Sequence, residues 1–312
     1  MEWIEPQFGQ EDHWLAQPHP LLTYHKVPYL MAARGRQEEC RRSLTWIKAN
    51  LMTPEGDFHG APAEDGKAAQ AAFVREKCWV AMAAQISGRY DISMPAAHYL
   101  ASCQGGSTGG VYNVDATGAR EEAADVRATA SAGAVFVATG CLCQARLAGR
   151  FLARAIQLQS EQHRFFVRMD DLGRTVNKVP RAHAAADTVV KPTRGAQLSY
   201  LAMPIIFLVR LQMATGETEW LEAAMDYYAF TDQFREEALH GDDSAAMAWA
   251  AGMLYGATRR RVYYDAAEKV CERWLDCQKN DGSWRKSKDT AAAIALTSQT
   301  AVSLFEALRE AQ

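Results

Sequence analysis

The sequence predicts an all-α fold, an (α/α)6 toroid built from six helical hairpins. Apolar residues return every three or four positions along most of the 312 residues, a spacing typical of amphipathic helices. Similar short turns, among them "AARGRQEE", "ISGRYDIS" and "MATGETEW", recur roughly every 50 residues, as they do in repeat architectures. The last helical stretch, "AAAIALTSQTAVSLFEAL", is strongly apolar, whereas an open array of repeats would end in a polar cap. A closed ring is therefore favoured over an open superhelix.

Apolar runs between Gly and Pro stops alternate with amphipathic runs along the chain. A helix that is apolar nearly all round is buried, and one with a polar face lies at the surface. The expected inner helices cover residues 21–34, 70–87, 127–146, 196–215, 243–257 and 289–310. The expected outer helices cover residues 36–51, 91–104, 148–159, 218–234 and 262–278. No linker-like composition interrupts the pattern, so one domain over residues 1–312 is expected.

Bulk properties exclude several classes of partner. A formal net charge of -3 gives no reason to expect a nucleic acid. Seven scattered cysteines argue against a disulfide framework. The start of the chain lacks the apolar core of a signal peptide, and no stretch of about 18 apolar residues is apparent, so we expect a cytoplasmic protein without a membrane span. No Asp-rich diphosphate motif, Gly-rich phosphate loop or zinc helix occurs, so no cofactor or metal is expected. The oligomeric state stays unknown.

Aromatic turns follow the outer helices. In "QKNDGSW" a Gln ends an outer helix and a Trp follows a Gly turn. Gln278, Gly282 and Trp284 resemble the QW motif of the terpenoid cyclase and protein prenyltransferase toroid superfamily. Looser copies pair Gln104 with Tyr112, Gln159 with Phe166 and Gly56 with Phe58. The motif implies a structural role, in which the aromatic ring packs between hairpins and the Gln amide satisfies helix-terminal backbone groups.

The stretch "HGDDSAAMAW" opens an expected inner helix. It resembles the D-x-D-D-T-A motif of class II terpene cyclases, which implies that Asp242 is the proton donor and Asp243 its carboxylate neighbour. His240 departs from the motif, because it stands where the first Asp should be. The alternative is an ordinary N-terminal helix cap with acidic residues favoured by the helix dipole.

Polar residues on the other inner helices are further candidates. Pro28 lacks an amide and should loosen the first inner helix near Tyr24 and His25. Glu76 and Lys77 interrupt an apolar helix and need partners or a wet cavity. Together these groups could supply an acid, a base and an oxyanion donor, or form a structural ion-pair network. The expected catalytic residues are Asp242, Asp243, Tyr24, His25, Glu76 and Lys77, and the expected substrate-binding residues are Trp79, Tyr200, His240, Trp249 and Gln299.

The resemblance, together with inner helices rich in Ala, Met, Val and Trp, favours a cofactor-free cyclase or isomerase. Its expected substrate is a small apolar terpenoid or polyketide intermediate of natural-product biosynthesis. One alternative is a carbohydrate-active (α/α)6 enzyme, either a glycosidase or a sugar epimerase. Another is a non-catalytic binding or partner subunit. The longest break in the helical pattern, between Asp171 and Arg194 with His183, Asp187 and Lys191, is expected to be a lid or a disordered segment.

Overall fold

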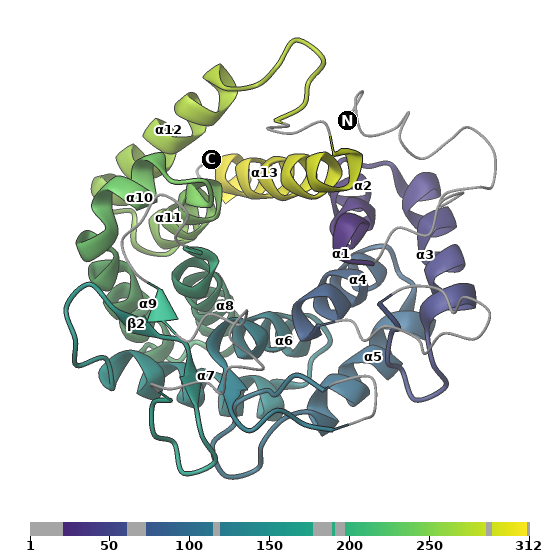
Figure 1. Ribbon diagram of the computed structural model, residues 1–312, viewed down its shortest axis with the longest axis horizontal. Helices are drawn as coiled ribbons and strands as arrows, with labels where there is room; N and C mark the ends of the chain where they lie inside the picture. Colours follow the sequence, from purple (N-terminus) through teal and green to yellow (C-terminus); the bar gives the residue numbers. More distant parts are fainter. Residues whose placement is uncertain are drawn as a thin grey trace. The chain divides into compact units, whose positions relative to one another are not determined.

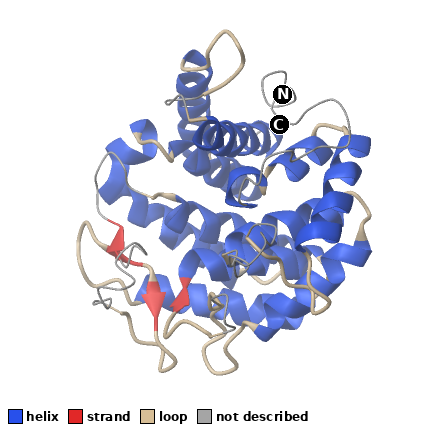
Figure 2. Ribbon diagram, turned by 45° about the vertical axis from the view of Figure 1, so that its right-hand side comes forward, coloured by secondary structure: helices blue, strands red, loops and turns tan. Residues whose placement is uncertain are grey.

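The computed structural model describes residues 21–60, 73–114, 119–176, 189–190, 197–284 and 289–310. These residues are mostly helical, with a few two-residue strands (Figure 2). The chain divides into two compact units, each described by itself below. The first unit holds Met1–Ser102, Val114–Ala119 and Trp274–Val302, and the second holds Cys103–Asn113, Arg120–Arg273 and Ser303–Gln312. The single domain expected over residues 1–312 stays a prediction.

The first unit is built from helical hairpins. Helix α2 packs against α3 and α4, and α4 packs against α5 (Figure 1). Its helices are α1 (Leu21–Tyr24), α2 (Val27–Ala33), α3 (Gln37–Leu51), α4 (Val74–Ile86), α5 (Tyr90–Ser102) and the first part of α13 (Thr290–Glu310). Helix α3 buries one face and exposes the other, whereas most of α4 is buried. This difference matches the predicted outer and inner classes.

The second unit repeats the same arrangement. Helix α6 packs against α7 and α8, and α8 packs against α9 and α11 (Figure 1). Its longer helices are α6 (Val126–Ala138), α7 (Leu142–Gln157), α8 (Ser199–Thr215), α9 (Glu219–Phe230), α11 (Ser244–Thr258) and most of α12 (Arg261–Asp276). A 3-10 turn, Thr231–Phe234, and the short helix α10 (Arg235–His240) precede α11. Every residue of α11 from Ser244 to Leu254 is buried.

Two short antiparallel pairs of strands complete the second unit. Strand β1 (Ala124–Asp125) pairs with β3 (Arg168–Met169), and β2 (Phe165–Phe166) pairs with β4 (Val189–Val190). The segment proposed as a lid falls mostly on residues 177–188 and 191–196, which lie outside the described residues.

The turn inside each hairpin contains a residue with left-handed backbone conformation. Gly35, Gly88, Gly140 and Gly216 have φ between +74° and +78°, and Arg259 takes the same place at +56°. Glycine is favoured there because it has no Cβ to clash. The turn at Gly140 corrects one expected helix, since the run predicted over 127–146 is two helices that end and begin around it.

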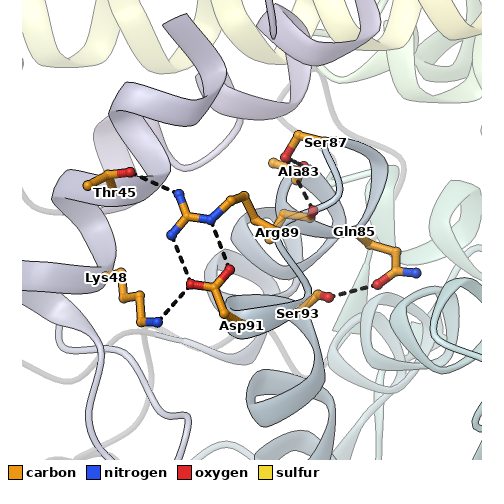
Figure 3. Close-up of polar contacts among 9 residues, drawn as sticks. Thr45, Lys48, Ala83, Gln85, Ser87, Arg89, Asp91 and Ser93 are labelled. Carbon is orange, nitrogen blue, oxygen red and sulfur yellow. Dashed lines mark hydrogen bonds and ion pairs between the residues drawn. The ribbon is translucent and has the colours of Figure 1, made fainter. Parts of the chain in front are cut away.

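Figure 3 shows how one hairpin corner is held in the first unit. The Arg89 guanidinium donates two hydrogen bonds of 2.9 Å to Asp91 at the start of α5, and the Lys48 ammonium of α3 lies 2.7 Å from the same carboxylate. Hydrogen bonds from Arg89 and Lys48 lower the pKa of Asp91. Arg89 also donates to the Thr45 hydroxyl at 2.8 Å. Since Lys48 and Asp91 are exposed and Arg89 is only half-buried, we expect these contacts to contribute little to the free energy of unfolding.

The QW-like turn has the packing role expected from the sequence. Trp284 is buried, its indole Nε1 donates to the Trp274 carbonyl at 2.7 Å, and its backbone N donates to Thr297 at 3.2 Å. The Gln278 amide donates to the Gly282 carbonyl at 2.9 Å and closes the turn.

The looser copies of this turn behave similarly. The Gln104 amide donates to the carbonyls of Gly109 at 2.9 Å and Gln144 at 3.1 Å. The Gln159 amide both donates to and accepts from the Phe166 backbone, at 3.2 and 2.7 Å. The aromatic residues of these copies are all buried: Phe58, Tyr112 and Phe166.

Helix α13 differs from one expectation. Thr290–Glu310 is long and apolar enough to cross a membrane by length and composition, although 56% of its most apolar window is buried in the protein. A core helix of a soluble protein passes the same test. The fully buried Glu306 lies on this helix, 2.7 Å from Arg309. The cytoplasmic location stays a prediction.

Candidate functional site

His25 lies at a break between α1 and α2. Pro28 cannot donate the backbone hydrogen bond that would continue the helix to the Tyr24 carbonyl, and its ring would clash there. The chain therefore leaves α1 at Tyr24 and enters α2 at Val27, with His25 and Lys26 in the turn. The expected loosening of the first inner helix is confirmed.

The His25 imidazole is held in one tautomer. Its Nδ1 lies 2.9 Å from the Leu22 carbonyl, which can only accept, so Nδ1 carries the proton. Burial lowers the pKa of His25 well below its usual value, and the cations of Lys26 and Arg75 lower it further. The ring is therefore neutral near pH 7, and Nε2 is a buried acceptor without a hydrogen-bond partner among the described residues.

Glu76 is the third residue of α4. Its Oε2 accepts from the Phe73 backbone N at 3.1 Å, which satisfies one free amide at the helix start. Its Oε1 is buried, lies 3.7 Å from the Arg75 guanidinium and accepts no hydrogen bond within the described part of the chain. Burial raises the pKa of Glu76, although Arg75, the Phe73 amide and Lys26 oppose the shift. The carboxyl is thus biased toward its protonated form.

His25 and Glu76 lie in the same neighbourhood of the first unit. Helix α2 packs on α4, and the rings of Tyr29 and Trp79 meet edge to face at 5.1 Å. The Lys26 ammonium lies 5.9 Å from the centre of the Trp79 ring. Lys26 and Arg75 act on the pKa values of both His25 and Glu76. The residues around the packing of α2 on α4 therefore include a neutral imidazole, a carboxyl group whose pKa is raised by burial, and two aromatic rings.

Tyr24 adds a third buried polar group from α1. Its side chain is fully buried, and burial raises the pKa of the phenol. Its hydroxyl has no hydrogen-bond partner among the residues that the structure describes. A buried polar atom left without a partner costs about 1–3 kcal/mol. Such groups are rare in natural proteins, and each needs an explanation.

Lys77 does not pair with Glu76 as one alternative expected. Its ammonium lies 2.5 Å from Asp57 and 3.4 Å from the Tyr99 hydroxyl, over whose ring it sits at 4.8 Å. Lys77 is almost fully buried, so this contact ties the turn after α3 to α4 and α5. Asp57 had no sequence signal of its own beyond its place before the aromatic Phe58.

A separate polar group lies where α6, α8 and α11 of the second unit begin. The Arg127 guanidinium donates to Gln197 Oε1 at 3.0 Å, Ser199 Oγ at 3.1 Å and the Tyr200 hydroxyl at 3.2 Å. Its Cζ lies 4.2 Å from the centre of the Tyr200 ring. Asp243 accepts from the Ser199 backbone N at 2.6 Å and so caps α8 instead of its own helix.

The remaining expected site residues are placed differently. The side chains of Asp242 and His240 are exposed, so Asp242 lacks the buried surroundings that the cyclase hypothesis requires. Trp249 is buried, and the Arg210 guanidinium lies 5.4 Å from its ring centre. Gln299 is half-buried on α13. The expected residues divide between the two units: the first holds Tyr24, His25, Glu76, Lys77, Trp79 and Gln299, and the second holds Tyr200, His240, Asp242, Asp243 and Trp249.

Arg127 was missed by sequence reasoning, although the signal existed. It is a charged residue near the start of an apolar inner helix, the criterion that singled out Glu76. Among the described residues, no group of three or more His, Cys, Asp or Glu side chains is placed to hold a metal ion.

No protein-family model and no curated protein matches the sequence. Among solved structures, the chain is similar to a D-mannose isomerase, with a TM-score of 0.68, 13% identity and coverage of 93% of this chain and 87% of the other. It is also similar to a family 76 glycoside hydrolase, a mannosidase from Bacteroides thetaiotaomicron, with a TM-score of 0.65, 14% identity and coverage of 96% and 90%. A sugar epimerase from a ruminal bacterium follows at a TM-score of 0.58, 10% identity and coverage of 90% and 87%.

These similarities correct the functional prediction. The solved structures named above are a D-mannose isomerase, a mannosidase and a sugar epimerase, so the predicted terpenoid or polyketide cyclase, its place in natural-product biosynthesis and its small apolar substrate were wrong. The physical reason lies in the inner helices. Their Ala, Met, Val and Trp side chains are buried core residues, as along α11, so their apolar character does not describe a ligand. The QW-like turn likewise reports packing between repeats. The chain has the predicted all-α fold, an (α/α)6 toroid.

Proposed function

We propose that this chain is a carbohydrate-active enzyme of the isomerase or epimerase type, which moves a proton between positions of a sugar. One observation carries the proposal. His25 is a buried neutral imidazole whose Nε2 has no hydrogen-bond partner among the described residues, and Lys26 and Arg75 act on its pKa and on that of Glu76, a buried carboxyl biased toward the acid. An imidazole lone pair can take a proton from carbon, and a carboxylic acid can give one to oxygen.

For aldose–ketose isomerisation the steps balance without a further reactant. His25 Nε2 takes the proton from the sugar carbon beside the carbonyl, while Glu76 gives its proton to the carbonyl oxygen, forming an enediol. The imidazolium then protonates the other carbon, and Glu76 recovers a proton from the hydroxyl that becomes the new carbonyl. The rings of Tyr29 and Trp79, which meet at 5.1 Å, offer an apolar face to the C–H groups of a sugar.

Hydrolysis finds less support in the described residues. Glycosidases use two carboxyl groups on either side of the scissile bond. Within the described part of the first unit, Glu76 is the one buried carboxyl. In the second unit, buried Asp125 accepts from the Ala128 backbone N at 2.7 Å, and buried Glu306 lies 2.7 Å from Arg309. Among the described residues of the first unit, Glu76 therefore has no second buried carboxyl group beside it.

The fold neighbours suggest where to begin, since two of the solved structures named above are a D-mannose isomerase and a mannosidase. The purified protein is incubated in D2O with D-mannose, D-fructose and D-glucose, and products and deuterium on carbon are followed by NMR. Interconversion of sugars, with deuterium at the carbon beside the carbonyl, supports the proposal.

Three variants sharpen this test. His25→Asn and Glu76→Gln are expected to lower turnover at least 100-fold, the usual contribution of a general acid or base. Lys48→Met, in an exposed ion pair of the same unit, is the control and should keep activity. Release of sugar from p-nitrophenyl mannoside without isotope exchange would instead indicate hydrolysis. Full activity in both site variants would reject the assigned residues.

A further inference from the structure

Arg127 differs in its partners from two other arginines of the second unit, Arg168 and Arg146. Arg168 lies 3.1 Å from Glu121, and Arg146 lies 2.9 Å from Glu217. Among the described residues, the guanidinium of Arg127 instead contacts neutral groups: an amide oxygen, two hydroxyls and the Tyr200 ring. Arg127 is half-buried, so its charge loses part of its hydration without gaining an opposite charge.

The same contacts fix the plane of the Arg127 guanidinium and use only some of its N–H donors. An arginine has five N–H donors in a rigid fork. Nη1 uses two of them, on Gln197 and Ser199, and Nη2 uses one, on the Tyr200 hydroxyl. The Tyr200 ring stacks at 4.2 Å. The Nε donor and one Nη2 donor are left without an acceptor in the described part of the chain, and the plane is already fixed for a ligand.

Two carboxylates, Asp125 and Asp243, precede the helices that begin near Arg127, and each accepts a hydrogen bond from a helix backbone amide. Asp125 accepts from the Ala128 backbone N at 2.7 Å, and Asp243 accepts from the Ser199 backbone N at 2.6 Å. Each carboxylate thus faces the positive end of a helix dipole. Neither forms an ion pair within 4.0 Å of Arg127 among the described residues, so they lessen the local positive charge but leave the guanidinium unpaired.

From this geometry we infer that Arg127, oriented by Gln197, Ser199 and Tyr200, binds the carboxylate of an acidic sugar. The inference adds a carboxylate-binding site in the second unit, and it rests on the proposed function for the sugar part of the ligand. One planar guanidinium with two spare donors matches a planar, singly charged carboxylate. A phosphate group carries up to two charges and three acceptor oxygens, and the described contacts offer it one cation.

Binding is measured by calorimetry on the full chain with D-glucuronate, D-galacturonate and their neutral counterparts D-glucose and D-galactose. A uronate should bind at least tenfold more tightly than its neutral counterpart, and the difference should shrink as salt is raised. Arg127→Met should weaken uronate binding roughly 10- to 100-fold, the range for hydrogen bonds to a charged group. It should change binding of the neutral sugar far less. Arg127→Lys should recover part of the affinity.

Arg146→Met, which removes a half-buried ion pair of the same unit, is the matched control and should leave uronate affinity unchanged. Circular dichroism and thermal melting establish that each variant is folded. Equal binding of uronate and neutral sugar, equal loss of both in Arg127→Met, or no uronate binding at millimolar concentration would overturn the inference. Tighter binding of D-glucose 6-phosphate than of D-glucuronate, lost in Arg127→Met, would overturn the carboxylate assignment. Turnover of neutral sugars without any binding of uronate would retain the proposed function while overturning this inference.

Discussion

Replacing Glu76 by Gln should stabilise the protein near pH 8 while removing turnover. The Gln oxygen can still accept the hydrogen bond from the Phe73 backbone N, which Glu76 accepts at 3.1 Å. The substitution removes a negative charge from a side chain that is 2% exposed. Its Oε1 has no hydrogen bond within the described residues, and the Arg75 guanidinium is 3.7 Å away. A residue that is retained for catalysis at a cost in stability should give a variant that is more stable but less active.

The expected gain follows from the burial penalty. An unsatisfied buried polar group costs about 1–3 kcal/mol, and more when it is charged. Because Arg75 offsets part of this cost, we expect the variant to gain roughly 1–2 kcal/mol at pH 8, which is a rise in Tm of about 1.5–3 °C for a chain of this size. Burial raises the pKa of Glu76 in the folded state. Its contribution to stability is therefore fully present below the unfolded pKa of about 4.3 and is lost as pH rises through the folded pKa. The advantage of the variant should vanish near pH 4 and grow with pH.

Thermal and urea denaturation of both proteins at pH 4.5 and pH 8, with turnover measured in parallel, test this reasoning. Glu39→Gln is the matched control, because the contact with Arg36 lowers the pKa of that carboxyl. The control should lose a little stability at pH 8 and keep its activity. A fall in the Tm of Glu76→Gln at pH 8 by several degrees would mean that the carboxylate is a structural ion-pair partner of Arg75, and it would refute the argument.

Three further predictions concern stability. Burial depresses the pKa of His25, so the contribution of His25 to stability is present above about pH 6.5 and is lost as pH falls toward the folded pKa. The Tm of His25→Asn should therefore fall less between pH 7 and pH 5 than the Tm of the wild type. An equal fall would show that His25 does not cause the loss of stability at low pH. Trp284→Ala should cost about 3–5 kcal/mol in urea unfolding, whereas Gln278→Ala should cost about 1 kcal/mol. Equal costs would argue against the packing role of the indole. Gly56→Ala should destabilise far more than Gly88→Ala: both glycines have positive φ, but a Cβ at the first would meet backbone oxygen at 2.3 Å and one at the second would meet nothing within 4 Å. Similar melting temperatures for these two variants would contradict that explanation.

Much of the helical pattern could be predicted because it depends on local spacing. The inner helix expected over 243–257 is α11 over 244–258, and the outer helix expected over 36–51 is α3 over 37–51. The error near Gly140 has a local cause as well, because the apolar run continues through the turn and hides the glycine stop. The Gln residues of the repeated turns were also predictable, since Gln278, Gln104 and Gln159 each bond a backbone group of their own turn, although Gln104 also bonds the distant Gln144 carbonyl.

The candidate site could be predicted only in part. Pro28 marked the helix break at His25, and the charge of Glu76 in an apolar helix marked the second group. Which partner each side chain takes could not be read from the chain. Lys77 stands next to Glu76 but pairs with Asp57, because neighbours on a helix point about 100° apart and partners come from other elements.

The sequence by itself determined the alternation of buried and surface helices, the turns between them and the structural role of the QW-like motif. These features follow from hydrophobic period, glycine conformation and short-range hydrogen bonds. Only the tertiary structure decided that the apolar inner faces pack on one another, that His25 and Glu76 are buried with atoms unsatisfied among the described residues, and that Arg127 contacts neutral groups there. Burial and charge compensation depend on which helices come together, and composition alone does not contain that information.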